Sequence, residues 1–351
     1  MKNFYSGKKV LVTGHTGFKG SWMCKLLIEW DANVIGYALQ PAEGLYQLTD
    51  IDSKIKSYIG DIRDLKLLNE IFEKEQPEIV IHLAAQPLVR EAYASPVYTY
   101  AVNVMGTVNV MECVRNNTCV KSLVNVTTDK VYENKEWEWG YRENENLNGF
   151  DPYSNSKSCS ELVTSSYCKS FFEDRDVAVS TARAGNVIGG GDFSKDRIIP
   201  DCVRAALNEK NIRVRNKNSV RPYQHVLEPI YAYLLIAKKQ YEDKKFAGCY
   251  NVGPDEKDCW TTGLLVEEFC KKWNTVRGKN IGWYSELNQG PHEANFLKLD
   301  CSHIKKKMNW KPTWDVRTAI GKTVEWYNIW DNKQDINKCM KEQIQSFLSN
   351  Q

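Results

Sequence analysis

A tyrosine and a lysine four positions apart, Tyr153 and Lys157, are the residues of this sequence whose types and spacing best suit acid–base chemistry. In a helix, positions i and i+4 lie on the same face, so the phenol and the ammonium would be neighbours. A free phenol has a pKa of about 10, and a nearby positive charge stabilises its phenolate. Such a pair can take a proton from an alcohol while the same carbon loses hydride. Because this spacing also arises by chance in many helices, its meaning depends on its place in the fold.

A second cluster, Thr128, Asp129 and Lys130, follows the predicted strand Leu123–Val126. In a parallel sheet, reactive residues gather at the carboxyl ends of the strands. There Thr128 can hydrogen-bond a reacting hydroxyl, and both charged neighbours can reach a cleft once the strand alternation breaks. The alternative is that Asp129 and Lys130 form an ordinary ion pair on a surface loop.

A glycine-rich segment, Thr13–Gly20, lies between the first predicted strand and the first long predicted helix. Glycine lets the backbone turn tightly and approach a pyrophosphate, whose charge meets the free N–H groups at the helix start. The alternative, a glycine turn without a ligand, is disfavoured by this position. The residues predicted to bind a dinucleotide here are Gly14, Thr16, Gly17, Phe18, Lys19 and Gly20.

The acidic residue that usually holds the adenosine ribose is missing, because the second strand ends at residues 36–39, Gly-Tyr-Ala-Leu, with neither a carboxylate nor an arginine. This position therefore leaves NAD and NADP undecided. Asp61, followed by Ile62, is a candidate contact to the adenine, although the same segment could equally cap the next helix.

The loop after the fourth predicted strand carries further candidates. Small residues let a chain pass close beneath a cofactor, and the cofactor contacts predicted here are Leu83, Ala84 and Ala85. Gln86 and Arg90 lie nearer the expected cleft and are predicted to contact the substrate, with an ordinary solvated side chain as the alternative for Arg90. His82 precedes the loop and is expected to be a packed strand residue rather than a ligand.

Short apolar runs alternate with helical stretches through the first half of the chain, which is typical of a parallel sheet covered on both faces. The predicted strands are Val10–Val12, Val34–Ile35, Tyr58–Ile59, Ile79–Ile81, Leu123–Val126 and Val177–Val179. The predicted helices are Phe18–Trp30, Leu65–Lys74, Thr99–Asn116 and Tyr153–Phe172. This pattern predicts an α/β fold, a Rossmann-like, doubly wound parallel sheet.

After about Gly185 the pattern loosens into glycine-rich loops and isolated helices such as Leu227–Gln240 and Thr261–Trp273. We predict a dinucleotide-binding part over residues 1–185, to which segments near 221–255 return, and a smaller lobe with C-terminal helices over 186–351, mainly for substrate binding. Seven tryptophans between Trp260 and Trp330 suit the core of this lobe better than a ligand platform. The polar tail from residue 331 to 351 is expected to form a peripheral helix.

Composition narrows the classes of function. The 351 residues carry 47 basic and 44 acidic side chains, a net charge of +3 that is too balanced for a protein whose main ligand is nucleic acid. The eleven cysteines include no C-x-x-C pair, so we expect reduced thiols, no metal site and a cytoplasmic protein. No signal peptide or apolar run of membrane-spanning length is found, so no membrane partner is expected.

Together these residues resemble the extended short-chain dehydrogenase/reductase superfamily and, more narrowly, the CDP-glucose 4,6-dehydratase family. The motifs that carry the resemblance span most of residues 8–330 and are GHTGFKGSW (14–22), HLAAQPLVR (82–90), TTDKVYEN (127–134), EWGYRE (138–143), DPYSNSK (151–157), RAGNVIGGGD (183–192), RPYQHVLEP (221–229) and GPHEA (290–294). Two positions depart from the family, Tyr223 where tryptophan is common and Val131 where cysteine is common.

The resemblance implies an NAD-dependent lyase that converts CDP-D-glucose to CDP-4-keto-6-deoxy-D-glucose, a step toward the deoxysugars of bacterial surface polysaccharides. Tyr153 would remove the O4 proton while NAD takes hydride from C4, water would leave across C5 and C6, and the hydride would return to C6. Asp129 would protonate the departing C6 hydroxyl. Lys130 stands where related dehydratases carry a glutamate base; an ammonium cannot abstract a proton, so Lys130 must either be neutralised or stabilise the enolate.

The resemblance also implies substrate contacts and an assembly. The residues placed at the nucleotide and its diphosphate are Asn186, Arg197 and Arg221, with weaker claims for His225 and His292. Helices matching Thr99–Asn116 and Tyr153–Phe172 pack between subunits in similar proteins, so a homodimer is expected. The nearest rival is an epimerase or reductase on the same fold, which needs no eliminating pair. A non-catalytic dinucleotide sensor is a third reading, which the intact Tyr153 and Lys157 disfavour.

Overall fold

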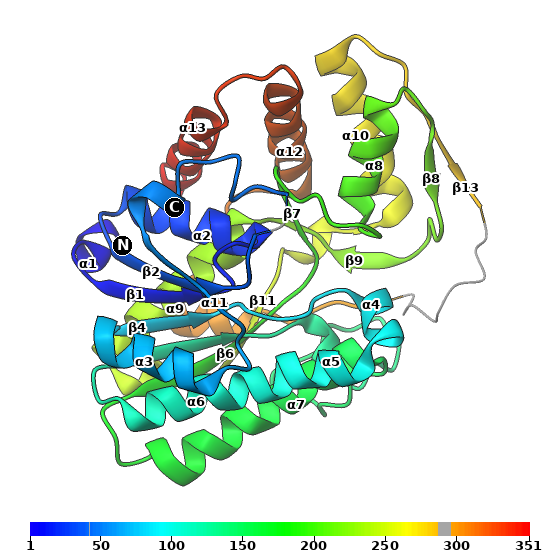
Figure 1. Cartoon of the computed structure of the whole chain (residues 1–351). Coiled ribbons are helices and arrows are strands. Elements are labelled where there is room, and N and C mark those ends of the chain that lie inside the picture. Colours follow the sequence, from blue (N-terminus) through cyan, green and yellow to red (C-terminus); the bar gives the residue numbers. More distant parts are fainter. Residues whose placement is uncertain (42, 287–295) are drawn as a thin grey trace.

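Seven parallel strands form the central sheet of the computed structural model, which describes residues 1–41, 43–286 and 296–351 (Figure 1). The strands are β1 (Lys9–Thr13), β2 (Asn33–Ala38), β3 (Lys56–Ile59), β4 (Ile79–His82), β5 (Ser122–Val126), β6 (Ala178–Ala184) and β11 (Cys249–Val252). Their order is β11-β6-β5-β4-β1-β2-β3, with every neighbouring pair parallel. The chain winds outward in both directions from β1, which confirms the predicted Rossmann-like fold.

Helices cover both faces of the sheet (Figure 1). On one face lie α2 (Phe18–Glu29) and α9 (Leu227–Glu242), and on the other α3 (Leu65–Glu75), α6 (Gly106–Asn116) and α7 (Pro152–Tyr167). Successive strand residues point to opposite faces, so Val10 and Val12 enter one core while Leu11, between them, enters the other. This two-sided burial explains the near-continuous apolar strands of the sequence.

The helices that carry the predicted site differ in detail from the expectation. Asp151 caps α7 by accepting a hydrogen bond from the Ser154 N–H at 3.0 Å, and Pro152 occupies the first turn, so the helix starts where the sequence places it. The stretch Thr99–Asn116 is interrupted by a π-helical turn at Ala101–Met105, preceded by α5 (Pro96–Tyr100). A similar π-helical turn, Cys168–Phe172, ends the α7 region.

A smaller group of elements stands beside the carboxyl edge of the sheet (Figure 1). Its helices are α8 (Ile198–Leu207), α10 (Thr262–Arg277) and α12 (Val316–Asp331). Its strands pair in twos, β7 (Val187–Ile188) with β10 (Gln224–His225), β9 (Val220–Pro222) with β12 (Cys259–Thr261), and β8 (Ile212–Val214) with β13 (Trp283–Ser285). The tryptophans of this region are buried or half-buried, as expected for core anchors.

Among the elements that the sequence did not predict as the structure has them, two belong to the main sheet and its core. Strand β11 extends the sheet beyond β6, although its four residues carry only a weak strand signal. The C-terminal helix α13 (Ile336–Leu348) is more than peripheral, because Met340, Ile344 and Phe347 are buried in the main core. The remaining short helices are α1 (Lys2–Tyr5), α4 (Val89–Ala94) and α11 (Ser302–Met308).

All eleven cysteines are free thiols. Within residues 1–41, 43–286 and 296–351, no three His, Cys, Asp or Glu side chains gather as a metal site would need. Among the same residues, no helix combines the length and the apolar character that crossing a membrane requires.

Candidate active site

A cavity of about 810 Å³ opens at the carboxyl edge of the sheet, between the strand ends and the smaller group of elements. The predicted residues that line it are Gly14, Thr16, Gly17, Phe18, Lys19, Gly20, Asp61, Ile62, Leu83, Ala84, Ala85, Arg90, Thr128, Asp129, Lys130, Tyr153, Lys157, Asn186, Arg197 and Arg221. Tyr153 and Asp129 therefore face one cavity, although they come from α7 and from the end of β5.

The glycine loop fits a pyrophosphate. Gly14 has a φ of +76°, and a Cβ there would lie 2.8 Å from the Ala84 nitrogen. A Cβ on Gly20 would lie 2.1 Å from the Gly14 carbonyl oxygen, so the loop can close only with glycine at both positions. No side chain caps α2 at Gly17, which leaves the N–H groups of the first turn for an anionic ligand.

At the opposite side of the glycine loop, the cavity is lined by the ends of β2 and β3. The segment after β3 was expected either to cap the next helix or to contact the adenine. In the structure Asp64 caps α3 by accepting a hydrogen bond from the Leu67 N–H at 3.0 Å, whereas Asp61 lines the cavity. Arg63 holds the Asp61 carboxylate at 2.7 Å and lowers its pKa. The Tyr37 hydroxyl donates to the Asp61 carbonyl at 2.7 Å, so a hydroxyl stands near the place where a carboxylate is usual.

Asp129 is a buried carboxyl rather than half of a surface ion pair. It begins a short 3₁₀ turn after β5 and is 1% exposed. Its Oδ1 accepts a hydrogen bond from Thr128 at 3.0 Å, while Oδ2 has no hydrogen-bond partner among the described residues. Burial raises the pKa of Asp129, against the opposing effects of Lys130, Thr128, Arg221 and Lys19. A carboxyl that retains its proton can donate it to a leaving oxygen.

Lys157 ties α7 to the end of β5, since its Nζ donates to the Val126 carbonyl at 3.1 Å. Burial lowers the pKa of Lys157 to about 8, and the Glu161 carboxylate opposes that shift. Burial also raises the pKa of Tyr153 to about 12, although the Thr128 hydroxyl favours the phenolate. The structure thus differs from the expected lowering of the phenol pKa, because loss of solvent outweighs the favourable neighbours.

Several basic residues line the cavity. Arg197 pairs with Asp192 at 3.2 Å, and Arg90, still 40% exposed at its side chain, pairs with Asp196 at 3.1 Å. Arg221 is buried in the cavity wall. Guanidinium groups in this arrangement are suited to a diphosphate.

Sequence reasoning missed two further arginines in this wall, Arg213 and Arg215. Arg213 lies on β8 and Arg215 directly follows it, and they pair with Glu286 at 2.7 Å and with Asp196 at 3.3 Å. The signal was present, because residues 212–215 alternate apolar and basic as a half-buried strand does.

Gln86, a predicted substrate contact, is held by neighbouring residues of the chain. Its side chain is buried and does not line the cavity, because both ends of the amide are already bonded. Nε2 donates to Thr99 at 2.8 Å, and Oε1 accepts from the Leu88 N–H at 2.6 Å. Gln86 therefore braces the loop that follows β4.

Two of the three histidines considered in the sequence analysis are packed inside the protein. His82 is packed in β4, with Nδ1 2.7 Å from the Thr13 hydroxyl, as expected. His225 is buried between the rings of Trp22 and Trp314 and does not line the cavity, so the weaker claim for it is not supported. His292 lies outside the described residues.

The sequence matches known proteins along its length. The model of the GDP-mannose 4,6-dehydratase family matches residues 11–323. The CDP-glucose 4,6-dehydratase of Salmonella typhimurium is 45% identical over 99% of this chain and 98% of its own. The human dTDP-D-glucose 4,6-dehydratase is 26% identical over 95% of this chain and 94% of its own.

Solved structures share the fold at lower identity. The dTDP-glucose 4,6-dehydratase of Bacillus anthracis, solved in complex with NAD, superposes with a TM-score of 0.76 at 21% identity, covering 93% of this chain and 99% of its own. The UDP-glucose 4-epimerase of Thermotoga maritima, solved with UDP-glucose, gives a TM-score of 0.78 at 21% identity, covering 91% and 98%.

Proposed function

The chain belongs to the GDP-mannose 4,6-dehydratase family, and from that premise we propose that it converts CDP-D-glucose to CDP-4-keto-6-deoxy-D-glucose. It is an NAD-dependent hydro-lyase, and nucleotide-sugar 4,6-dehydration is its reaction. The Salmonella relative, 45% identical along the whole chain, supports CDP-glucose as the particular substrate.

The observation that carries the proposal is the pairing of an acid and a base in one cavity. Asp129 is buried with one carboxyl oxygen unpartnered among the described residues, so a leaving hydroxyl can receive its proton. Tyr153 lines the same cavity on a helix that Lys157 anchors to β5. An epimerase or a reductase needs the base but not the second group.

Each residue then has a defined task. When bound, NAD supplies the redox chemistry, oxidising the C4 alcohol and later reducing C6. Tyr153 takes the O4 proton, with Thr128 orienting that oxygen and Lys157 supporting the phenolate. The C4 ketone acidifies the C5 proton, which is lost to solvent, and Asp129 protonates the C6 hydroxyl as water departs; C5 regains a proton from solvent when C6 is reduced. We assign Lys130 to the enolate, because an ammonium supplies the positive charge that an enolate oxygen needs.

Binding residues follow the same division. We propose that NAD is held by the glycine loop, residues 83–85, Asp61 and Ile62, together with Tyr153 and Lys157, which line the same cavity. Arg90, Asn186, Arg197 and Arg221 hold the nucleotide sugar. Residues 1–185, together with segments near 221–255, make the NAD-binding part, and the remainder of 186–351 mainly serves the substrate.

We further propose a homodimer that works in the cytoplasm. Large apolar side chains project from the α5–α7 region, with Met105 52%, Leu162 57% and Phe171 45% exposed. Large apolar side chains left exposed on segments that pack against α7 favour association. Light scattering should report twice the chain mass, and Leu162→Glu should reduce it; a monomeric wild-type protein would contradict the assembly.

The test offers CDP-, dTDP-, UDP- and GDP-hexoses to the purified enzyme with NAD in deuterated water. We expect CDP-glucose to lose water with solvent deuterium at C5, while the C4 hydrogen is transferred internally to C6. A product of unchanged mass with an inverted C4 centre would establish an epimerase instead. Preference for another nucleotide would retain dehydration and overturn the CDP assignment.

A further inference from the structure

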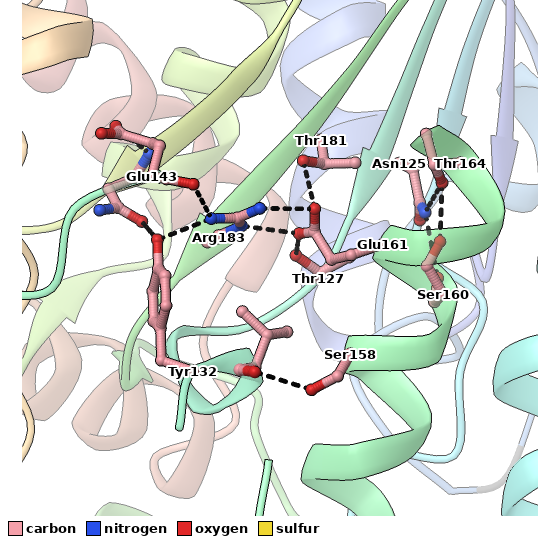
Figure 2. Close-up of polar contacts among 12 residues, drawn as sticks. Asn125, Thr127, Tyr132, Glu143, Ser158, Ser160, Glu161, Thr164, Thr181 and Arg183 are labelled. Atoms are coloured by element: carbon pink, nitrogen blue, oxygen red, sulfur yellow. Dashed lines mark hydrogen bonds and ion pairs between the residues drawn. The ribbon is translucent and has the colours of Figure 1, made fainter. Parts of the chain in front are cut away.

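One to two helical turns along α7 from Tyr153 and Lys157, a buried polar network joins α7 to β5 and β6 (Figure 2). Its centre is Glu161, which lies on α7 four positions after Lys157 and eight after Tyr153, and so on the same face of the helix. The side chains of Glu161 and its partner Arg183 are each 2% exposed.

Both oxygens of Glu161 are fully used. Oε1 accepts from the Thr127 hydroxyl at 2.5 Å and from Arg183 Nε at 2.9 Å. Oε2 accepts from the Thr181 hydroxyl at 2.7 Å and from Arg183 Nη2 at 2.9 Å. On its other side, Arg183 Nη1 donates to the Tyr132 hydroxyl at 2.8 Å. Figure 2 shows the carboxylate held between the fork of the guanidinium and two threonines.

This ion pair is poor evidence for stability alone. Removing two charges from water costs about as much as their attraction returns, and apolar replacements of buried pairs are often as stable. We therefore looked at the groups that the Glu161–Arg183 pair holds in place.

Those groups belong to the site. Val126 and Thr127, successive residues at the end of β5, are tied to Lys157 and Glu161, which lie on successive turns of α7. The next residues along the chain are Thr128 and Asp129. The two contacts therefore set the register between the segment that carries the acid and the helix that carries the base.

Glu161 also supplies a negative charge that favours the protonated form of Lys157. Lys19 from α2 and Lys157 repel one another, and His82 from β4 is a buried imidazole held neutral, with a pKa lowered to about 3. Among the described residues, Glu161 is the carboxylate whose charge favours the Lys157 ammonium.

We propose that Glu161 is a positioning residue of the dehydratase: it clamps the end of β5 to α7 and keeps Lys157 protonated beside Tyr153. The inference rests on the proposed role of the Tyr153–Lys157 pair. It gives a mechanistic reason for retaining a charged pair where an apolar one would pack.

The test is Glu161→Gln, which keeps the shape of the side chain and removes its charge. We expect kcat to fall about tenfold at neutral pH with KM within about twofold, and the alkaline limb of the kcat profile to move down by about one pH unit. Thr181→Val is the matched control, since it removes one hydrogen bond to Glu161 without changing charge and should leave the alkaline limb in place.

The double variant Glu161→Gln with Arg183→Met separates the proposed role from folding. Removing both charges should restore the melting temperature lost in Glu161→Gln, while the shifted alkaline limb persists. Recovery of the wild-type profile in the double variant, or an unshifted limb in Glu161→Gln, would overturn the proposal.

A titration without substrate keeps this test distinct from the test of the function. In protein labelled with ¹³C at lysine Cε, the Lys157 resonance, assigned with Lys157→Arg, should titrate at lower pH in Glu161→Gln. If the wild-type enzyme dehydrates no nucleotide sugar, the proposed function fails while this titration still decides the charge effect. A Lys157 titration that does not move refutes that effect.

Discussion

Asp129→Asn is the substitution that most directly tests the division of labour in the cavity. The amide keeps the shape of the carboxyl and its contact with Thr128, but it has no acidic proton to give to the C6 oxygen. Oxidation at C4 depends on Tyr153 and should continue. Loss of water should not.

General acid catalysis sets the expected loss of rate, and the burial of Asp129 sets the expected change in stability. A positioned general acid contributes about 10²–10⁴-fold, so kcat for dehydration should fall about 10³-fold, equivalent to about 4 kcal/mol in the activation barrier. Stability should move the other way. Because burial raises the pKa of Asp129 in the folded state, the folded chain retains a proton that the unfolded chain loses, and stability declines as pH rises above the unfolded pKa. Asparagine has no such decline, so the variant should be at least as stable as the wild type at pH 8.

The assay quenches the reaction with borodeuteride and analyses the sugar by mass spectrometry. The variant should accumulate a 4-keto sugar that still carries oxygen at C6, trapped as deuterium at C4. Wild-type turnover in Asp129→Asn would remove Asp129 from the mechanism. Loss of C4 oxidation together with dehydration, accompanied by a lower melting temperature, would show instead that the side chain supports the site structurally.

Three further predictions test other parts of the reasoning. Lys130→Ala should leave NAD binding, followed by fluorescence titration, intact while stopping water loss; full turnover would exclude Lys130. Gly190→Ala should lower stability by about 2 kcal/mol or more in thermal denaturation, because its Cβ would lie 1.9 Å from the Trp326 ring; Gly321→Ala, with nothing within 4 Å, is the control and should stabilise α12 by up to about 1 kcal/mol. Burial raises the pKa of Glu228 to about 7, so wild-type stability should fall by about 2 kcal/mol from pH 5 to 7, and Glu228→Gln should flatten that dependence; parallel denaturation curves for both proteins would contradict it.

The parts of the fold that follow from local pattern were predictable. For strands β1 to β6 and the helices between them, the spacing of apolar residues along the sequence is enough to predict the element. Strand β11 does not, because its position depends on the exposed edge of β6, which only the assembled sheet presents. The polar composition of residues 331–351 hid an apolar stripe, Met340, Ile344 and Phe347, that the helical period reveals only once α13 is placed on the core.

The candidate site divides in the same way. The Tyr153–Lys157 pair lies on one helix and the glycine loop on one short strand-to-helix junction, so spacing along the chain brings their members together. The hydrogen bond from Gln86 to Thr99 was not predictable, because the two residues lie on either side of α4 and only the folded chain brings them together. The pairing of Glu161 with Arg183 also needed the fold, although the recurrence of a charged residue four positions after Lys157 was a readable signal.

Burial acts in opposite senses on the two halves of this site. It favours the neutral form of every group, which suits Asp129, since a proton donor must keep its proton until water leaves. It works against Tyr153, whose phenolate must form in the same dry cavity. The neighbours oppose burial at both groups: the Thr128 hydroxyl and the Arg197 charge favour the phenolate, and Lys130, Thr128, Arg221 and Lys19 favour the Asp129 carboxylate. What distinguishes Asp129 is that one of its oxygens has no hydrogen-bond partner in the described part of the chain, so that oxygen can present a proton to the C6 oxygen.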